Sequence, residues 1–286
     1  MLRCRCFKGL IASPAWAVCF ALVVSGVSGA AADDAVGGDG KLKIFVLAGQ
    51  SNMAGRALTK ELPESLRTPP ENVLMVDNRG ALLPMRYRNS FGPEVSFAHE
   101  MAKRFPRDRV VIAKFAVGGT SAIAWSPQWS EQRARITKND RQGSLYEKLA
   151  KQVRPLLKRE DAEVVGILWA QGGRDARFEE AWKAYEQNVK VVLSALQNDF
   201  RRPGSSPAPL LIAETVAAPA DRFPGVEFIR TAQRKLAREM PGVSLVSSEG
   251  LKTGSDQVHF NAEGQVELGR RFAAAWDAAI AARQEK

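Results

Sequence analysis

The sequence has few of the residues that metal centres and disulfide frameworks require. Its 286 residues include three cysteines, Cys4, Cys6 and Cys19, and two histidines, His99 and His259. Neither an HExxH pattern nor a cysteine cluster is present, and two histidines leave little room for a zinc site. We therefore expect an activity that needs no metal and no cofactor.

The sequence also lacks an apolar run of the roughly 20 residues that a membrane-spanning helix needs. The uncharged run Ala15–Val27 is shorter, follows basic residues between Arg3 and Lys8, and precedes the small residues Gly29–Ala32. This pattern favours a cleaved secretory signal over residues 1–30 rather than a membrane anchor. We expect an exported protein, periplasmic or extracellular, with no stable membrane insertion after cleavage.

All three cysteines fall inside this signal, so the mature chain would rest on its core without disulfides. Cys19 is a poor lipidation site because Val18 precedes it, where a small residue is expected. Without the three basic residues of the signal, the formal net charge falls from +10 to +7. These charges are spread along the chain with no nucleic-acid motif, which indicates a solvated surface; weak attraction to anionic cell-surface polymers is the alternative.

Short apolar runs rich in Val, Ile and Leu recur along the chain and are typical of strands buried on both faces. They are Lys43–Ala48, Val73–Val76, Val110–Ala116, Val164–Ala170 and Leu210–Val216. Helical patterns lie between several of these runs, and the alternation predicts a parallel sheet covered on both sides. Residues 31–42 read as a flexible leader, and residues 43–286 as one α/β domain.

Three segments have helical periodicity. Ser144–Glu160 begins with a capping box and contains Pro155, which we expect to kink or shorten its end. Asp175–Leu196 carries aromatic residues and valines at helical spacing. The chain ends in a helix from about Ala262 to Arg283.

The stretch Lys43–Arg56, KIFVLAGQSNMAGR, runs from an apolar strand directly into Gly-Gln-Ser-Asn-Met. In open parallel sheets, ligands bind outside the carboxyl ends of the strands, and Ser51 would lie there. A serine hydroxyl is a poor nucleophile unless a base takes its proton. The amino end of a following helix helps to stabilise negative charge that develops during attack.

Of the two histidines, His259 is the better candidate for that base. Asp256 precedes it by three residues, and in a turn such an aspartate reaches Nδ1 and leaves Nε2 free to accept the serine proton. Taken alone, the pattern also fits an ordinary loop in which Asn261 caps the last helix. His99 follows what reads as the first turns of a helix, and we interpret it as a surface or half-buried structural residue.

An ester hydrolase also needs hydrogen-bond donors aimed at the oxyanion of the tetrahedral intermediate. Gly118 and Gly119 follow the run Val110–Ala116, so a backbone N–H can face the site with no Cβ in the way. Gln171 follows the run Val164–Ala170 and is a candidate side-chain donor. Considered singly, a tight turn and a polar strand end explain these residues as well.

Four blocks in this order and spacing carry a resemblance: Gly49–Met53, Gly118–Ser121, Trp169–Gly172 and Asp256–His259. The chain resembles the SGNH hydrolases, and more closely the sialate O-acetylesterase and acetylxylan esterase group, carbohydrate esterase family six. The likeness covers roughly residues 43–276. It implies a flavodoxin-like three-layer α/β/α sandwich around a mainly parallel five-stranded sheet.

The resemblance also implies roles for single residues. Ser51 would be the nucleophile, His259 the base and Asp256 its orienter. The oxyanion hole would comprise the N–H groups of Ser51 and Gly119, with Gln171 where other SGNH enzymes use asparagine. Further candidates for contact with the substrate are Gln50, Asn52, Arg56, Trp125 and Arg174.

The third block departs from the pattern of this group. The usual Gln-Gly-Glu-x-Asp is here Gln171-Gly172-Gly173-Arg174-Asp175, so the glutamate is missing and a cation follows. Triad chemistry does not depend on that glutamate, but its loss leaves the substrate class open. Arg174 is either solvated and balanced by nearby acids, or part of a cationic mouth that favours acetylated sugars with a carboxylate.

We predict an exported serine esterase that removes O-acetyl groups from a carbohydrate such as acetylxylan, a sialic acid or a related glycan. A lipase or thioesterase of the SGNH type is one alternative, but the loop Thr120–Gly143 carries Trp125 and Trp129 among many polar groups. These rings either stack on sugars or close the core. A glycan-binding protein without catalysis is the other alternative. The oligomeric state stays open.

Overall fold

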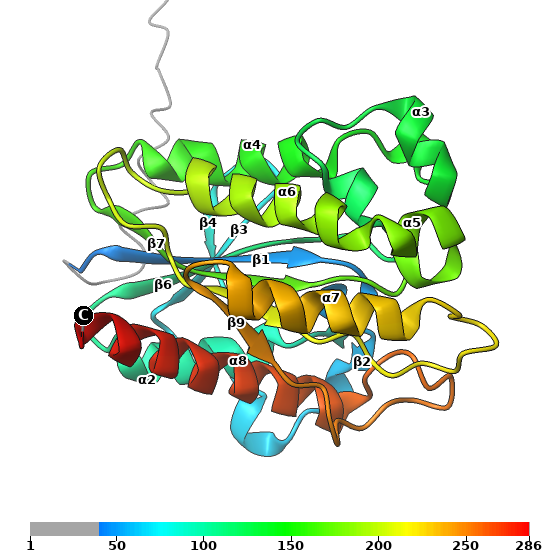
Figure 1. Ribbon diagram of the computed structural model, residues 1–286. Helices are drawn as coiled ribbons and strands as arrows, with labels where there is room; N and C mark the ends of the chain where they lie inside the picture. The colour runs from blue at the N-terminus through cyan, green and yellow to red at the C-terminus, as the bar shows by residue number, and fades with distance from the viewer. Residues whose placement is uncertain (1–39, 286) are drawn as a thin grey trace, which may run out of the picture.

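The computed structural model describes residues 40–285, so the predicted signal and most of the predicted leader lie outside the described residues. Residues 40–285 form a seven-stranded sheet in the order β4-β3-β6-β1-β7-β8-β9, covered by helices on both faces (Figure 1). This is the three-layer α/β/α arrangement that the resemblance implies. No helix of this part of the chain is both long and apolar enough to span a membrane.

The five predicted strands are all present and parallel, which confirms the expected centre of the sheet. They are β1 Leu42–Gly49, β3 Val73–Val76, β6 Arg109–Ala116, β7 Ala162–Ala170 and β8 Leu210–Ala213. The prediction of only five strands was wrong. β9 Val243–Val246 extends the sheet in parallel, and β4 Leu82–Pro84 pairs antiparallel with β3. Neither was recognised, because β9 is interrupted by a serine and β4 is a short, mostly exposed edge strand that ends in proline.

Two short strands, β2 Ala57–Leu58 and β5 Ser90–Phe91, form a separate antiparallel pair. The helices in chain order are α1 Ser51–Ala54, α2 Glu94–Arg104, α3 Glu131–Ala134, α4 Leu145–Leu157, α5 Glu179–Lys183, α6 Tyr185–Asp199, α7 Val226–Glu239 and α8 Ala262–Gln284. Short 3-10 turns lie at Thr59–Glu61, Glu64–Leu66, Ala122–Trp125, Arg135–Thr137, Asp140–Gln142 and Asp175–Arg177.

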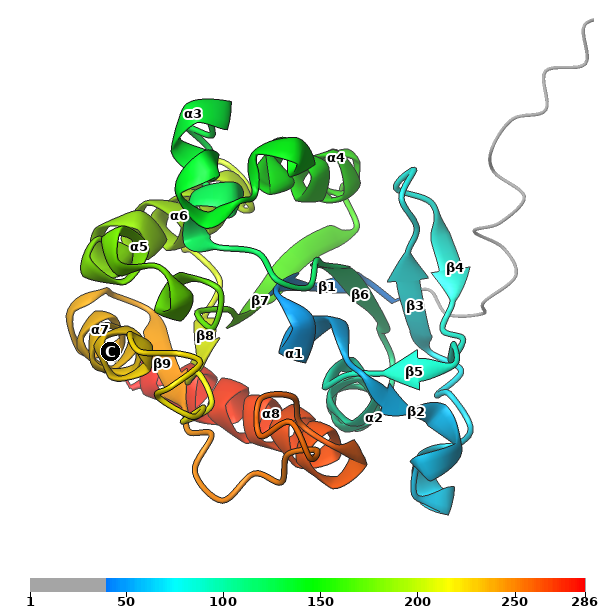
Figure 2. The same cartoon turned by 90° about the vertical axis from the view of Figure 1, so that its right-hand side faces the viewer.

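The central strand β1 shows why the chain folds in layers. Its side chains alternate between two hydrophobic clusters, with Ile44 and Val46 on one face and Phe45 and Leu47 on the other. The first cluster packs against α4, α6 and α7, and the second against α2 and α8 (Figure 2). Because β1 has parallel neighbours on both sides, its carboxyl end is a rigid support for the residues that follow.

Two helix predictions have different outcomes. α4 begins as expected, since Ser144 Oγ accepts a hydrogen bond from the Glu147 N–H at 3.2 Å, and it ends two residues after Pro155. The predicted single helix Asp175–Leu196 is instead a 3-10 turn followed by α5 and α6. The break occurs because Phe178 is extended, with φ −129° and ψ 121°. The terminal helix α8 matches its prediction closely.

Candidate active site

The turn after β1 places Ser51 at the first position of α1, near the middle of the molecule (Figure 2). Gly49 makes this turn with φ 144°, and a Cβ there would lie 2.1 Å from the Ala170 carbonyl oxygen. Only glycine fits a backbone in such close contact with the neighbouring strand. Ser51 is only 5% exposed, so it lies just below the protein surface and not free in solvent.

The structure brings Ser51, His259 and Asp256 together in one hydrogen-bonded chain. Ser51 Oγ lies 2.9 Å from His259 Nε2, and His259 Nδ1 lies 2.5 Å from Asp256 Oδ2. The serine and the histidine are 208 residues apart in the sequence. With Nδ1 bonded to the carboxylate, the ring presents Nε2 to the hydroxyl, which is the geometry of an activated nucleophile.

Asp256 is poised as an anion. Burial alone would raise its pKa, but hydrogen bonds from the N–H groups of His259 and Val258, with the imidazole, lower the pKa to about 2. These N–H groups donate to Asp256 Oδ1 at 3.0 and 2.9 Å. The carboxylate therefore stays ionised at neutral pH, and its contact with Nδ1 favours the ring tautomer that leaves Nε2 without a proton.

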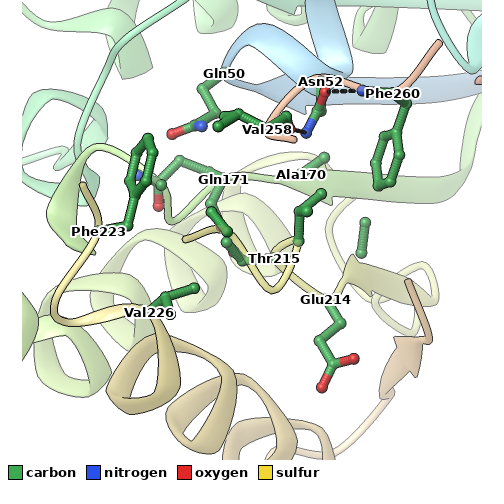
Figure 3. A pocket seen from close by; sticks show the side chains of 14 residues that line it. Gln50, Asn52, Ala170, Gln171, Glu214, Thr215, Phe223, Val226, Val258 and Phe260 are labelled. Atoms are coloured by element: carbon green, nitrogen blue, oxygen red, sulfur yellow. Dashed lines mark hydrogen bonds between the residues drawn. The ribbon is translucent and has the colours of Figure 1, made fainter. Parts of the chain in front are cut away.

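Asn52 holds the loop that carries His259. Its Nδ2 donates to the Val258 carbonyl at 3.0 Å, and its Oδ1 accepts from the Phe260 N–H at 3.1 Å (Figure 3). Asn52 therefore has a structural role, and because it also lines the pocket beside the serine, its contact with the substrate stays a prediction. The residue after the serine thus joins the nucleophile turn to the histidine loop.

The turn after β6 contains Gly119, the predicted backbone donor. Gly119 has φ 68° and is exposed, and a Cβ on Gly118 would lie 3.7 Å from the Cβ of Ser51. Within residues 40–285, neither the Ser51 N–H nor the Gly119 N–H donates to another protein group. Both N–H groups are thus available to an oxyanion beside the serine.

The expectation that Gln171 donates to the oxyanion is contradicted by its contacts. Its Nε2 donates to the Thr120 carbonyl at 2.9 Å and to Asp175 Oδ2 at 2.5 Å, which uses both amide protons. The residue is 2% exposed. Gln171 instead links the end of β7 to the turn that presents Gly119.

Asp175 is buried behind this link. Its carboxylate also accepts the Ala122 N–H, with both oxygens at 3.1 Å. Burial raises the pKa of Asp175 to about 7, against the lowering effect of the hydrogen bonds from Gln171 and Ala122. The sequence placed Asp175 in the third block but gave no indication of this contact.

The other predicted substrate contacts separate into buried and exposed groups. Trp125 is fully buried between Phe115 and Trp169, with ring centroids 5.8 and 5.4 Å away, and its indole N–H donates to Thr120 Oγ1 at 3.0 Å. Of the two alternatives for Trp125, the structure therefore supports closing the core, and the ring is not available to stack on a sugar. Gln50 is also buried, with Oε1 accepting from the backbone N–H groups of residues 172 and 174.

The two predicted arginines differ in their exposure. Arg56 is exposed, and a Cβ on Gly118 would lie 3.8 Å from its Nη2. Arg174 is half-buried over the Phe178 ring, 4.9 Å from its centroid, and its Nε donates to the Thr137 carbonyl at 2.9 Å. Burial, and next the nearby charge of Arg177, lower the pKa of Arg174.

A pocket opens beside the Ser51–His259 pair, at the ends of β7 and β8 (Figure 3). Its cavity volume is about 30 Å³, within an empty space of about 440 Å³ that includes open solvent. Its walls include the chain neighbours of both residues: Gln50, Asn52, Val258 and Phe260. Gly173 also lines it, and a Cβ there would lie 3.0 Å from Gln50 Nε2, so the position of the missing glutamate is packed closely against Gln50.

His99 lies in α2, away from this site. Its Nε2 is 2.8 Å from the Tyr87 hydroxyl, and burial, followed by the charge of Lys103, lowers its pKa. These contacts agree with the structural interpretation of His99. Residues 40–285 contain no group of three or more His, Cys, Asp and Glu side chains arranged to hold a metal ion.

The model of the family described as "Carbohydrate esterase, sialic acid-specific acetylesterase" matches residues 41–278. The chain belongs to this carbohydrate esterase family. A probable carbohydrate esterase of Arabidopsis thaliana is 26% identical over 257 residues, covering 82% of this chain and 90% of that protein. Membership makes this protein a carboxylic ester hydrolase of the carbohydrate acetylesterase type, and it confirms the resemblance found in the sequence.

Solved structures share the fold of this esterase. NanS superposes with a TM-score of 0.67 at 16% identity, covering 88% of this chain and all of that one. A crystal structure of an Arabidopsis thaliana protein has a TM-score of 0.66 at 24% identity, covering 83% and 98%. A carbohydrate acetylesterase of Xanthomonas citri has a TM-score of 0.61 at 15% identity, and the match spans 82% of this chain but 55% of that one.

Proposed function

We propose that this esterase removes O-acetyl groups from a carbohydrate through Ser51, His259 and Asp256. The observation that carries the proposal is the hydrogen-bonded chain from Ser51 Oγ to His259 Nε2 and from His259 Nδ1 to Asp256. This arrangement supports nucleophilic catalysis because the hydroxyl, its base and the group that orients the base are in contact.

In the first half of the reaction, Ser51 Oγ attacks the acetyl carbonyl carbon while His259 Nε2 takes the hydroxyl proton. The carbonyl oxygen becomes an oxyanion, and the N–H groups of Ser51 and Gly119 would donate to it. When the tetrahedral intermediate collapses, the bond to the sugar oxygen breaks and His259 returns the proton to that oxygen. The products are the free sugar hydroxyl and an acetyl-serine.

In the second half, His259 removes a proton from water, and the resulting hydroxide attacks the acetyl-serine carbonyl. Collapse of the second tetrahedral intermediate breaks the bond to Ser51 Oγ, which takes the proton back from His259, and releases acetate. Asp256 remains ionised throughout and stabilises the imidazolium that forms in each half. Each step uses groups within the described contacts.

We propose that the substrate is an acetylated sugar that carries a carboxylate. Arg56 supports this class because it is exposed beside Gly118, next to the serine, and makes no hydrogen bond or ion pair within residues 40–285. Arg174 is half-buried, and its Nε donates to the Thr137 carbonyl, which leaves its terminal amino groups as the donors that it could offer a carboxylate. A planar guanidinium suits a carboxylate because it can donate two parallel hydrogen bonds.

We further propose that residues 1–30 are a secretory signal and that the mature esterase is exported. The basic start, the short apolar run and the small residues that follow support this assignment. Expression of the full chain with N-terminal analysis of the mature protein tests it. A mature amino terminus near residue 31 is expected, and a protein that keeps residues 1–30 would contradict it.

The test of the activity is hydrolysis of a chromogenic acetyl ester and of acetylated carbohydrates by the wild-type enzyme and by Ser51→Ala. We expect acetate release from both substrate types and none above background in the variant. A series of esters with longer acyl chains separates the alternatives, because a lipase or thioesterase would prefer the longer chains. A protein that binds acetylated glycans without releasing acetate would be a glycan-binding homologue.

A further inference from the structure

The turn Gly118–Ala122 presents the Gly119 N–H, but sterics do not fix its direction. Gly118 and Gly119 are exposed, and a Cβ at Gly119 would meet nothing within 4 Å. Glycine at φ 68° in open space has wide conformational freedom. The direction of the N–H therefore depends on the hydrogen bonds that hold the turn.

Asn139, 18 to 20 residues further along the chain, supplies two of these hydrogen bonds. Its Nδ2 donates to the Gly119 carbonyl at 3.1 Å, and its Oδ1 accepts from the Ser121 N–H at 2.9 Å. Asn139 is 2% exposed, and Thr137 Oγ1 donates to the same Oδ1 at 3.2 Å. The Asn139 side chain is thus fixed beneath the turn, and it hydrogen-bonds to the backbone before and after Thr120.

Other contacts hold the two ends of the turn but not Gly119 itself. Thr120 Oγ1 donates to the Val117 carbonyl at 2.7 Å, and the Ala122 N–H donates to Asp175. Gln171 donates to the Thr120 carbonyl. Among these groups, Asn139 is the one that bonds to the peptide group directly after Gly119, and that bond limits rotation about the glycine.

The loop of His259 is held by the same pair of contacts. Asn52 donates to the Val258 carbonyl and accepts from the Phe260 N–H, so it hydrogen-bonds to the backbone before and after His259. In both loops an asparagine amide bonds to a carbonyl and to the N–H two residues later. One loop carries the base, and the other carries the oxyanion donor.

We propose that Asn139 is a positioning residue that orients the Gly119 N–H toward the oxyanion of the transition state. This inference rests on the proposed function. Asn139 lies beneath the turn and does not touch the substrate. Its loss removes stabilisation that exists only when the oxyanion forms, so it lowers kcat and leaves KM nearly unchanged.

The first test is Asn139→Asp, which keeps an acceptor for the Ser121 N–H but places a second oxygen against the Gly119 carbonyl. We expect kcat for a chromogenic acetyl ester to fall about 10- to 100-fold, with KM within about twofold, which is less than the roughly 10²- to 10³-fold loss for removal of an oxyanion donor. Affinity for a small alkylboronic acid, which forms a tetrahedral adduct on a serine, should weaken by a similar factor. Rates are normalised to the active sites titrated with a phosphonate ester.

Asn139→Ser removes both amide contacts without adding a charge. It replaces Asn139→Asp in the test if the aspartate variant does not fold. Asn72→Asp is the matched control, because Asn72 Nδ2 also fixes a loop through carbonyl oxygens, those of Ala102, Phe105 and Asp108, away from the site. We expect the control to lose stability while its kcat per titrated site stays at the wild-type value.

The results separate this inference from the proposed function. If the Asn139 variants melt earlier but match wild type in kcat per titrated site and in boronic acid affinity, Asn139 is structural and the inference is wrong. A rise in KM with unchanged kcat also overturns it. If the wild type itself releases no acetate, or Ser51→Ala remains active, the proposed function fails instead.

Discussion

The two loops that flank Ser51 are held by the same kind of contact but are built from different parts of the chain. Asn52, next to the serine, hydrogen-bonds to the loop of His259, while Asn139 hydrogen-bonds to the turn of Gly119. Within the histidine loop Asp256 bonds to groups two and three residues away, whereas Asn52 bonds to this loop from 206 and 208 residues away. On the oxyanion side, Asn139 is 18 and 20 residues from the groups that it bonds, and Gln171 is 51 residues from Thr120.

Asp256 on the histidine side and Asp175 on the oxyanion side also differ. The Asp256 side chain is 44% exposed, and hydrogen bonds to its charged form lower its pKa to about 2. Asp175 is fully buried, with no cation within salt-bridge distance in residues 40–285, and burial raises its pKa to about 7. One carboxylate is therefore suited to stabilise a charge that forms on His259, whereas the other is suited to hold backbone in place.

The largest effect is expected on the histidine side. Ser51→Ala and His259→Ala should each lower kcat/KM by at least about 10⁴-fold with the fold unchanged, because residues that act as a unit fail together. Kinetics with a chromogenic acetyl ester and circular dichroism measure activity and folding. A variant that keeps more than about a tenth of the wild-type rate would remove that residue from the mechanism.

Asp256→Asn should have a smaller but still large effect, about 10²- to 10⁴-fold in kcat, because the amide no longer fixes the productive tautomer of His259. The pH profile of kcat should change along with its magnitude. An unchanged rate would mean that the backbone alone orients the imidazole.

Asp175 should control how stability depends on pH. A carboxyl group whose pKa is raised from 3.8 to about 7 contributes stability that is fully present below pH 3.8 and is lost as the pH rises through about 7. The melting temperature of the wild type should therefore fall between pH 5 and pH 8.5 more than that of Asp175→Asn. Parallel pH dependences in the two proteins would show that Asp175 does not titrate in this range.

The pKa shift of Asp256 has the opposite sign, and so does its effect on the pH dependence of stability. Its pKa is lowered, so its contribution to stability is present above pH 3.8 and is lost as the pH falls through about 2. The contribution is small because the carboxylate is partly solvated. Asp256→Asn should thus change activity far more than it changes melting between pH 5 and pH 8.5, which is the reverse of the result for Asp175→Asn.

Arg56→Ala and Arg174→Ala should have modest effects confined to acidic substrates. We expect kcat/KM to fall about 3- to 10-fold on an acetylated sugar with a carboxylate, more for Arg56, and to stay constant on a matched neutral sugar. Added salt should reduce the difference, because both groups are at least partly exposed. Equal losses on both sugars, or no loss, would contradict the proposed substrate class.

His99→Gln should have the smallest effect. His99 lies in α2, where it bonds to Tyr87 and not to Ser51, so kcat/KM should stay within about twofold of wild type. Loss of activity in a folded variant would show that the choice between the two histidines was wrong.

The sequence predicted the elements whose information is local. The buried strands were recognised from apolar runs, and the start of α4 from the pairing of Ser144 with Glu147. Asp256 and His259 were recognisable because a three-residue spacing brings the two side chains together in a turn. β4 and β9 were not predicted, because edge strands need no continuous apolar run.

Residues whose contacts are long-range were predicted poorly. Trp125 was left between sugar stacking and the core, and the structure buries it against Trp169. Gln171 has a role that depends on Thr120 and Asp175, which no spacing in the sequence brings together. Asn139 lies in a polar loop with no motif around it, and its importance is visible only once the turn of Gly119 is seen above it.

The central claim is that Ser51 accepts the acetyl group from the substrate. The most direct measurement is rapid acid quenching of the wild-type enzyme during turnover of an acetylated carbohydrate, followed by mass spectrometry of the peptide that contains Ser51. The account predicts an acetyl group on Ser51 that appears within a single turnover and is absent from Ser51→Ala. Rapid acetate release with an acetyl group on another residue, or with the same rate in Ser51→Ala, would contradict it.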